Sequence, residues 1–191
     1  MKTNLLLLLI IILVSCNGNK ENNSDTTTEP IADNQELIDI YQNDQGDRQT
    51  DNINWGEVMV RDSLRRKRVN ELLDSNKVRT SNDYQNAAMV FQHGGDSTSY
   101  AKAVKFMKKA IELDSTTNKW LLAAATDRYL LSIGKPQIYG TQYIKMRGEP
   151  WELQEIDTTQ ITDAERIEFG VETLAQQREK VKRMNSERLS E

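Results

Sequence analysis

Beyond about residue 31, apolar residues recur every three or four positions over most of the chain, with polar residues between them. This spacing is typical of amphipathic helices, which bury one stripe of side chains and leave the rest in water. The expected helices cover residues 37–46, 55–73, 81–91, 96–111, 118–134 and 162–185. Short links between the third, fourth and fifth helices imply antiparallel neighbours. We therefore expect a mainly α fold, a compact bundle of about five to seven helices.

Capping residues mark several of these helix ends. Ser81 and Asp96 each precede an apolar stripe, and their side chains can accept hydrogen bonds from a first helical turn. Gly134 is the residue type that best accepts a left-handed C-terminal cap. Thr162, with Glu165 three residues later, has the spacing of a capping box and opens the last helical region.

The longest expected helix, after Trp55, has a strongly basic side. Four apolar residues of this helix are expected to face the core: Val60, Leu64, Leu72 and Leu73. The outer face then carries five cations: Arg61, Arg65, Arg66, Lys67 and Arg68. Because Glu57, Asp62 and Glu71 lie within helical reach, we interpret this face as a solvated surface rather than a phosphate site.

The pattern changes between residues 135 and 157, where apolar and aromatic residues are interrupted by Gly140, Gly148 and Pro150. Such a segment is either an irregular loop or a two-stranded hairpin that turns near residues 147–150. Because two strands alone are only marginally stable, we expect this small element to pack on the helices.

The N-terminus has a different character. Lys2 precedes an apolar run from Leu5 to Val14, which is too short to span a bilayer as a mature helix. The following Leu13-Val14-Ser15-Cys16 resembles the lipobox of bacterial lipoproteins. The resemblance implies cleavage before Cys16 and attachment of acyl chains such as palmitate to its thiol and new amino group. Asn17 follows, not the aspartate of an inner-membrane retention signal, so an outer membrane is favoured if the cell has one.

Three segments follow from this interpretation. Residues 1–15 are a signal peptide, residues 16–30 are the lipidated cysteine and a polar tether, and residues 31–191 are a single helical domain. Loss of residues 1–15 removes one of 25 basic residues, Lys2, and leaves 24 against 29 acidic residues, a formal charge of −5. An acidic chain at an extracytoplasmic address argues against nucleic acid as a partner. Cys16 is the only cysteine, so no disulfide can form within the chain.

A few polar side chains lie beside the apolar stripes, where burial is costly unless they are paired. These candidate site residues are Asp44, Gln45, Arg48, Gln92, His93, Asp127, Arg128, Gln137, Tyr139 and Gln142. His93 is the only histidine of the chain. One histidine and scattered carboxylates fall short of the usual metal-ligand clusters, so we expect neither a metal nor a cofactor.

The motif Gln137-Ile138-Tyr139-Gly140-Thr141-Gln142 resembles the hallmark of an uncharacterised bacterial family, a domain of unknown function. The pairs Asp44-Gln45, Gln92-His93 and Asp127-Arg128, together with Arg48, add to this resemblance, which covers about residues 37–169. The family's Gln-His-Ala-Asp is one residue longer here, as Gln92-His93-Gly94-Gly95-Asp96. The resemblance selects residues but implies no reaction.

Two interpretations of these residues compete. In one, they line a pocket where His93 acts as acid or base, oriented by Asp127, as in a hydrolase. In the other, they form a hydrogen-bonded network that fixes the loop from Tyr139 to Gln142 on the helices. We favour the second, with the chain as a cell-envelope binding or interaction module for an unknown protein or a small polar ligand.

Overall fold

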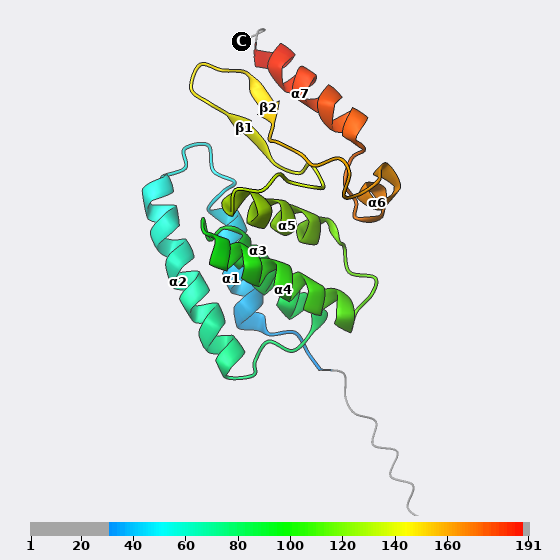
Figure 1. Ribbon diagram of the computed structural model, residues 1–191. Helices are drawn as coiled ribbons and strands as arrows, with labels where there is room; N and C mark the ends of the chain where they lie inside the picture. The colour runs from blue at the N-terminus through cyan, green and yellow to red at the C-terminus, as the bar shows by residue number, and fades with distance from the viewer. Residues whose placement is uncertain (1–30, 189–191) are drawn as a thin grey trace, which may run out of the picture. The chain divides into compact units, whose positions relative to one another are not determined.

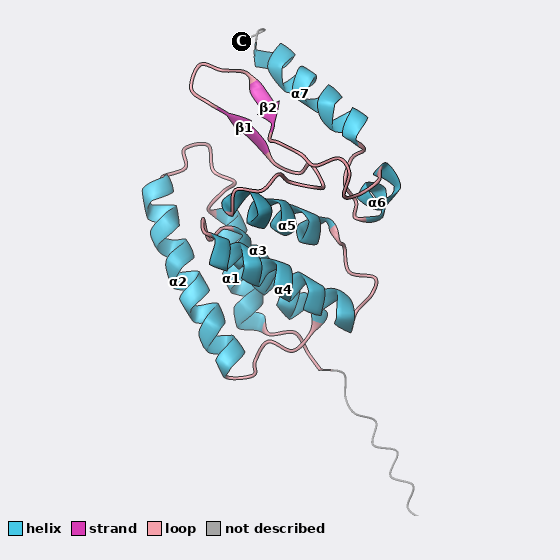
Figure 2. Cartoon of the chain, in the orientation of Figure 1, coloured by secondary structure: helices cyan, strands magenta, loops and turns pink. Residues whose placement is uncertain are grey.

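The computed structural model describes residues 31–188, and seven helices and one hairpin lie within this range (Figures 1 and 2). The helices are α1 (Gln35–Gly46), α2 (Trp55–Asp74), α3 (Ser81–Gln92), α4 (Ser97–Leu113), α5 (Trp120–Ser132), α6 (Asp163–Glu168) and α7 (Leu174–Arg188). The strands are β1 (Tyr143–Lys145) and β2 (Trp151–Leu153). The expected mainly α fold with a small hairpin is confirmed. The predicted signal peptide, Cys16 and the polar tether lie outside the described residues.

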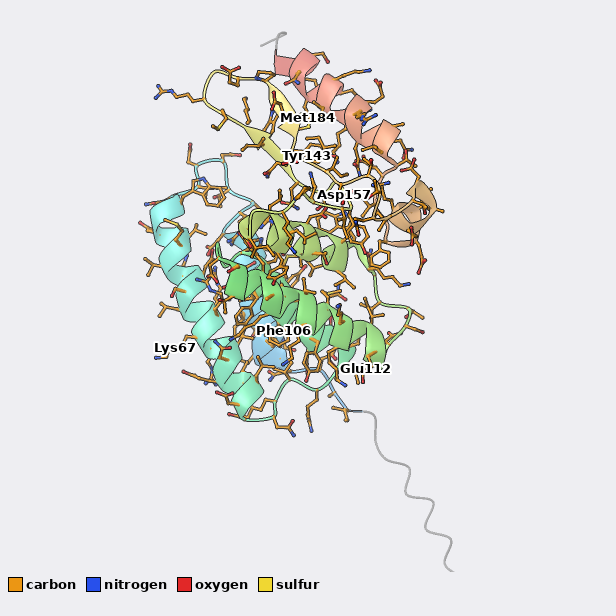
Figure 3. All side chains as sticks on the ribbon, viewed as in Figure 1. Lys67, Phe106, Glu112, Tyr143, Asp157 and Met184 are labelled. Atoms are coloured by element: carbon orange, nitrogen blue, oxygen red, sulfur yellow. The ribbon has the colours of Figure 1, made fainter. Side chains whose placement is uncertain are left out.

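Helices α3 and α4 form the centre of the domain, with α5 packed on α4 and α1 packed on α3. Alanines such as Ala87 and Ala103 are fully buried at these contacts, and their small side chains let the helices approach closely. Phe91 of α3 meets Phe106 of α4 edge to face, with ring centroids 5.4 Å apart. Figure 3 shows Phe106 among the helices and Lys67 on the outer side of α2.

Helix α2 is rotated relative to our expectation. Val60 and Leu64, predicted to face the core, are each 62% exposed, whereas Val58, Val69 and Leu72 are buried. Two charged side chains, Asp62 and Arg65, share the inward face. The spacing of apolar residues alone did not predict this orientation, because the end of α1 and the turn after it provide charged partners for both residues. The predicted basic face is therefore only partly solvated.

The helix ends mostly follow the predicted caps, with two corrections. Asp96 accepts from the Ser99 backbone N–H at 2.8 Å, and Thr162 and Glu165 form a capping box, as expected. The cap of α3 is Thr80 rather than Ser81, because Asp83 completes a capping box with Thr80. The last helical region is also broken into α6 and α7.

The hairpin takes the second of the two forms expected for its segment. Strands β1 and β2 pair antiparallel, with Tyr143 opposite Leu153, and the chain turns between residues 145 and 151. Asn185 of α7 brackets Trp151 of β2, accepting from its backbone N–H at 2.7 Å and donating to its carbonyl at 3.0 Å. Helix α7 therefore supports the hairpin from one side. Within residues 31–188, no helix has the length and apolar character needed to cross a membrane.

Candidate functional site

Asp127 of α5 is fully buried and holds the loop that follows the helix. One carboxylate oxygen accepts from the backbone N–H groups of Ile138 and Tyr139, both at 2.9 Å. The other accepts from the Thr141 N–H at 2.9 Å and from its hydroxyl at 2.8 Å. Four donors therefore satisfy this buried carboxylate within the chain.

Gln137 closes the same loop from the inside. Its amide oxygen accepts from the Gln142 N–H at 2.9 Å, and its amide nitrogen donates to the carbonyls of Gln142 and Gln154 at 2.9 and 3.0 Å. The Tyr139 carbonyl accepts from Arg166 and Gln177. The Tyr139 ring packs on the Phe169 ring, with centroids 4.9 Å apart. Burial, and then the negative charge of Asp127, raise the pKa of Tyr139.

Gly140 explains why the centre of this motif is a glycine. Its φ is +85°, a left-handed conformation that other residues adopt only with strain. A Cβ built at this position would also lie 2.0 Å from the Gln177 amide oxygen. A packed structural network therefore includes Asp127, Gln137, Tyr139 and Gln142. For these four candidate residues, this is the hydrogen-bonded network of the second interpretation.

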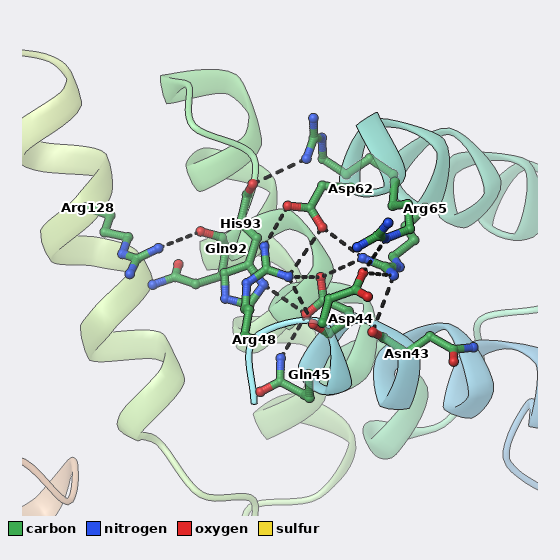
Figure 4. Close-up of polar contacts among 12 residues, drawn as sticks. Asn43, Asp44, Gln45, Arg48, Asp62, Arg65, Gln92, His93 and Arg128 are labelled. Carbon is green, nitrogen blue, oxygen red and sulfur yellow. Dashed lines mark hydrogen bonds and ion pairs between the residues drawn. The ribbon is translucent and has the colours of Figure 1, made fainter. Parts of the chain in front are cut away.

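A second cluster forms where α1 ends beside α2 and α3 (Figure 4). His93 Nδ1 lies 2.8 Å from Oδ2 of Asp44, which is fully buried. Gln45 donates to the same carboxylate at 2.8 Å, and Arg48 approaches it at 3.2 Å. Burial raises the pKa of Asp44. The hydrogen bond from His93 and the charges of His93 and Arg48 together lower it by more, so the pKa lies below its ordinary value.

Two residues of α2 complete this cluster, and the sequence interpretation had left them on a solvated face. Asp62, 3% exposed, accepts from Arg48 at 2.5 Å and from Arg65 at 2.9 Å. Arg65 also pairs with Asp47. The two buried carboxylates are thus balanced by two guanidinium groups, which buried charges require. Their signal in the sequence was a charged pair three residues apart on one helix face.

The turn after α3 presents His93 to a cleft. Gly94 permits this turn, because a Cβ there would lie 2.0 Å from the Ser99 Cβ on α4. The cleft has a volume of about 520 Å³ and is lined by Trp55, Met59, Arg66, His93, Tyr100 and Arg128, among others. Since Nδ1 of His93 is held by Asp44, Nε2 is the ring nitrogen available to a ligand.

Arg128 joins the loop network to the cleft. Its Nε donates to the Gln142 amide oxygen at 3.0 Å and its Nη1 donates to the Gln92 carbonyl at 2.8 Å. Burial, and the charge of Arg48, lower the pKa of Arg128, but an arginine keeps its charge in proteins. Among the described residues, no carboxylate pairs with it, and its Nη2 makes no hydrogen bond. The Gln92 amide oxygen, in a side chain only 4% exposed, also has no partner.

The ten predicted residues therefore divide into two groups instead of forming one pocket. The catalytic interpretation required Asp127 to contact His93. It does not, because donors of the loop occupy its four acceptor positions. Asp44 occupies the orienting position beside His93. In the described part of the chain, no three histidine, cysteine, aspartate or glutamate residues come together as a metal site.

Comparison of the chain with protein-family models, with curated proteins and with solved structures gives no match. The resemblance of the glutamine-tyrosine-glycine-threonine-glutamine motif to an uncharacterised family therefore stays a prediction.

Proposed function

We propose that the protein is a lipid-anchored binding protein of the cell envelope whose helical domain holds a small anionic ligand, a carboxylate or a phosphate, in the cleft beside His93. The observation that carries this proposal is the guanidinium of Arg128, which is half-buried in the cleft and has no carboxylate partner among residues 31–188. A buried cation is costly unless an anion or strong acceptors offset its charge. A ligand carboxylate or phosphate would supply that anion.

Arg66 strengthens the argument. It also lines the cleft and forms no ion pair with a described residue, and it donates only to the His93 carbonyl at 3.3 Å. Both guanidiniums thus bind carbonyls at the C-terminus of α3, whose dipole is equivalent to about half a negative charge. Asp62 also lines the cleft, but it is paired with Arg48 and Arg65. A backbone hydrogen bond and the charge of Arg66 lower the pKa of Asp96, so Arg128 is the cation of the cleft that most needs an anion.

The proposed attachment to a membrane depends on the N-terminal sequence. The resemblance of residues 13–16 to a lipobox supports cleavage and lipidation at Cys16, and two or more acyl chains give stable membrane attachment. The polar residues after Cys16 would then act as a spacer between the bilayer and the domain. An outer membrane is the favoured destination where the cell has one.

The single histidine makes the binding proposal testable at one site. The full chain is titrated with sodium phosphate and with sodium acetate at neutral pH while the NMR signals of the His93 ring are recorded. We expect saturable shifts, and we expect Arg128→Gln and Arg66→Gln each to weaken binding by about tenfold or more, the effect of losing a charged hydrogen bond.

The control is Lys67→Gln, which removes one positive charge from the outer side of α2 (Figure 3), at a residue that does not line the cleft. Arg66 makes fewer hydrogen bonds than Arg128, so Arg66→Gln is the variant less prone to a folding defect. A loss of binding in both variants therefore reports on the cleft rather than on folding. If neither anion shifts the His93 signals, or if Lys67→Gln weakens binding as much as the cleft variants, the proposal is wrong.

One observation favours a hydrolase as the second candidate. The Asp44–His93 pair has the arrangement of a general base and its orienting carboxylate, with Nε2 left for a water or substrate. The described residues that line the cleft include no serine, threonine or cysteine, so the base would have to activate water. Hydrolysis of p-nitrophenyl phosphate or p-nitrophenyl acetate that disappears in His93→Ala would support this candidate.

A further inference from the structure

The cleft is lined by apolar as well as charged side chains, and the apolar ones bear on the kind of anion it takes. Trp55 and Met59 of α2 both line the cleft, and they are 57% and 64% exposed. We infer that the ligand is an organic anion, a phosphate monoester or a carboxylate with an aromatic or apolar body that packs on Trp55. This inference rests on the proposed function and names the ligand class for the same cleft.

The volume of the cleft supports an organic ligand. A water-sized group occupies about 30 Å³, so a bare phosphate of five heavy atoms would fill less than about a third of the roughly 520 Å³. Small-molecule sites usually measure about 300 to 1,000 Å³. The same arithmetic gives room for about 17 heavy atoms, too few for a whole diacyl lipid. A soluble organic anion fits the space better than either a bare ion or a membrane lipid.

The position of the exposed apolar side chains also matters. Single exposed apolar residues are ordinary on protein surfaces, and Val60 and Leu64 on the same helix are examples. Trp55 and Met59 differ because they border the same cavity as Arg66 and Arg128, neither of which forms an ion pair with a described residue. Tryptophan and arginine are both enriched among the residues that contribute most to binding at protein interfaces. In this cleft the ring of Trp55 would pack on the ligand body, and a guanidinium would bind its charge. The cleft therefore matches a ligand with both features.

The test compares phenyl phosphate with inorganic phosphate on the full chain by calorimetry and by the His93 NMR signals. We expect phenyl phosphate to bind about tenfold more tightly, as stacking of one aromatic ring on another predicts. Trp55→Ala should bring the two affinities within about threefold of each other. Leu64→Ala is the matched control, since Leu64 is an exposed apolar residue of α2 that does not line this cleft.

Each outcome separates this inference from the proposed function. Equal affinities in the unaltered chain, with both lost in Arg128→Gln, would overturn the apolar-body inference and leave anion binding in place. A preference for phenyl phosphate that survives Trp55→Ala would also overturn it, because the ring would then pack elsewhere. Failure of both probes to bind would overturn the proposed function itself. Circular dichroism of Trp55→Ala confirms that the variant folds.

Discussion

Replacing Asp127 with asparagine is the sharpest test of the division between loop network and cleft. The carboxylate accepts four hydrogen bonds, from three backbone N–H groups and one hydroxyl, at 2.8 to 2.9 Å. Asparagine keeps one acceptor oxygen and places an NH₂ group where the second oxygen was. If the NH₂ group faces Ile138 and Tyr139, two N–H donors lose their acceptor. If it faces Thr141, the Thr141 N–H loses its acceptor, and the hydroxyl can turn to accept from the amide.

The expected loss of stability follows from this count. A hydrogen bond to a charged group contributes about 1.5 to 3 kcal/mol and one to a neutral group about 0.5 to 1.5 kcal/mol. One lost bond, together with two bonds weakened by loss of the charge, therefore costs about 3 to 6 kcal/mol. Burial of the carboxylate has its own desolvation cost, which asparagine avoids, so we take the lower end, about 3 kcal/mol. This is a large part of the roughly 5 to 15 kcal/mol that stabilises an ordinary domain.

Urea denaturation followed by circular dichroism measures this loss, with Asp114→Asn as the control. Asp114 also accepts from a backbone N–H and a hydroxyl, those of Thr116 two residues later, but it is exposed. Because water can replace these hydrogen bonds, the replacement should cost much less stability than that of Asp127. Amide NMR signals of Ile138, Tyr139 and Thr141 should move in the Asp127 variant. Equal losses of stability in the two variants would refute the reasoning.

Three further changes test other parts of the structure. His93→Ala should lower the free energy of unfolding by only about 1 kcal/mol, since Asp44 keeps donors from Gln45 and Arg48. The same variant should weaken phosphate binding. A loss of stability as large as that of Asp127→Asn in the same urea series would place His93 in the structural network. Burial raises the pKa of Tyr143 to about 12, above about 10 in the unfolded chain, so its contribution to stability is complete below about pH 10 and is lost as the pH rises through 12. Absorbance titration at alkaline pH should therefore lose its last step in Tyr143→Phe. An unchanged titration would contradict the burial of this side chain. Cys16→Ser should release the protein from membranes after an alkaline wash, and retention in the pellet would disprove the lipobox interpretation.

The sequence predicted best those features that depend on local chemistry. The cap at Asp96 and the box of Thr162 and Glu165 involve residues three positions apart, so the sequence contains both partners. The face of α2 was predicted wrongly because it depends on another helix. Arg65 turns inward to Asp62 and Asp47, and no count of apolar residues within α2 contains the Asp47 partner.

The break between α6 and α7 has a similar cause. The polar pattern of residues 162–185 is continuous, but Arg166 is buried and donates to the Tyr139 and Ile138 carbonyls of the loop. Gly170 then adopts a φ of +69°, and Thr173 accepts from the Gln176 N–H to begin α7. The break thus brings Arg166 and Gln177 onto the same loop, a requirement visible only in three dimensions.

Asp127 and Arg128 show why residue choice and residue role are separate problems. The two are neighbours on α5, and successive side chains on a helix point about 100° apart. That rotation sends Asp127 into the loop, where every acceptor position is filled, and Arg128 toward the cleft, where Nη2 has no partner among the described residues. Both looked alike in sequence, as charges beside an apolar stripe. A charge with four internal partners stabilises the fold, whereas a cation without an anion is available for a ligand, and only the second needs something from outside the chain.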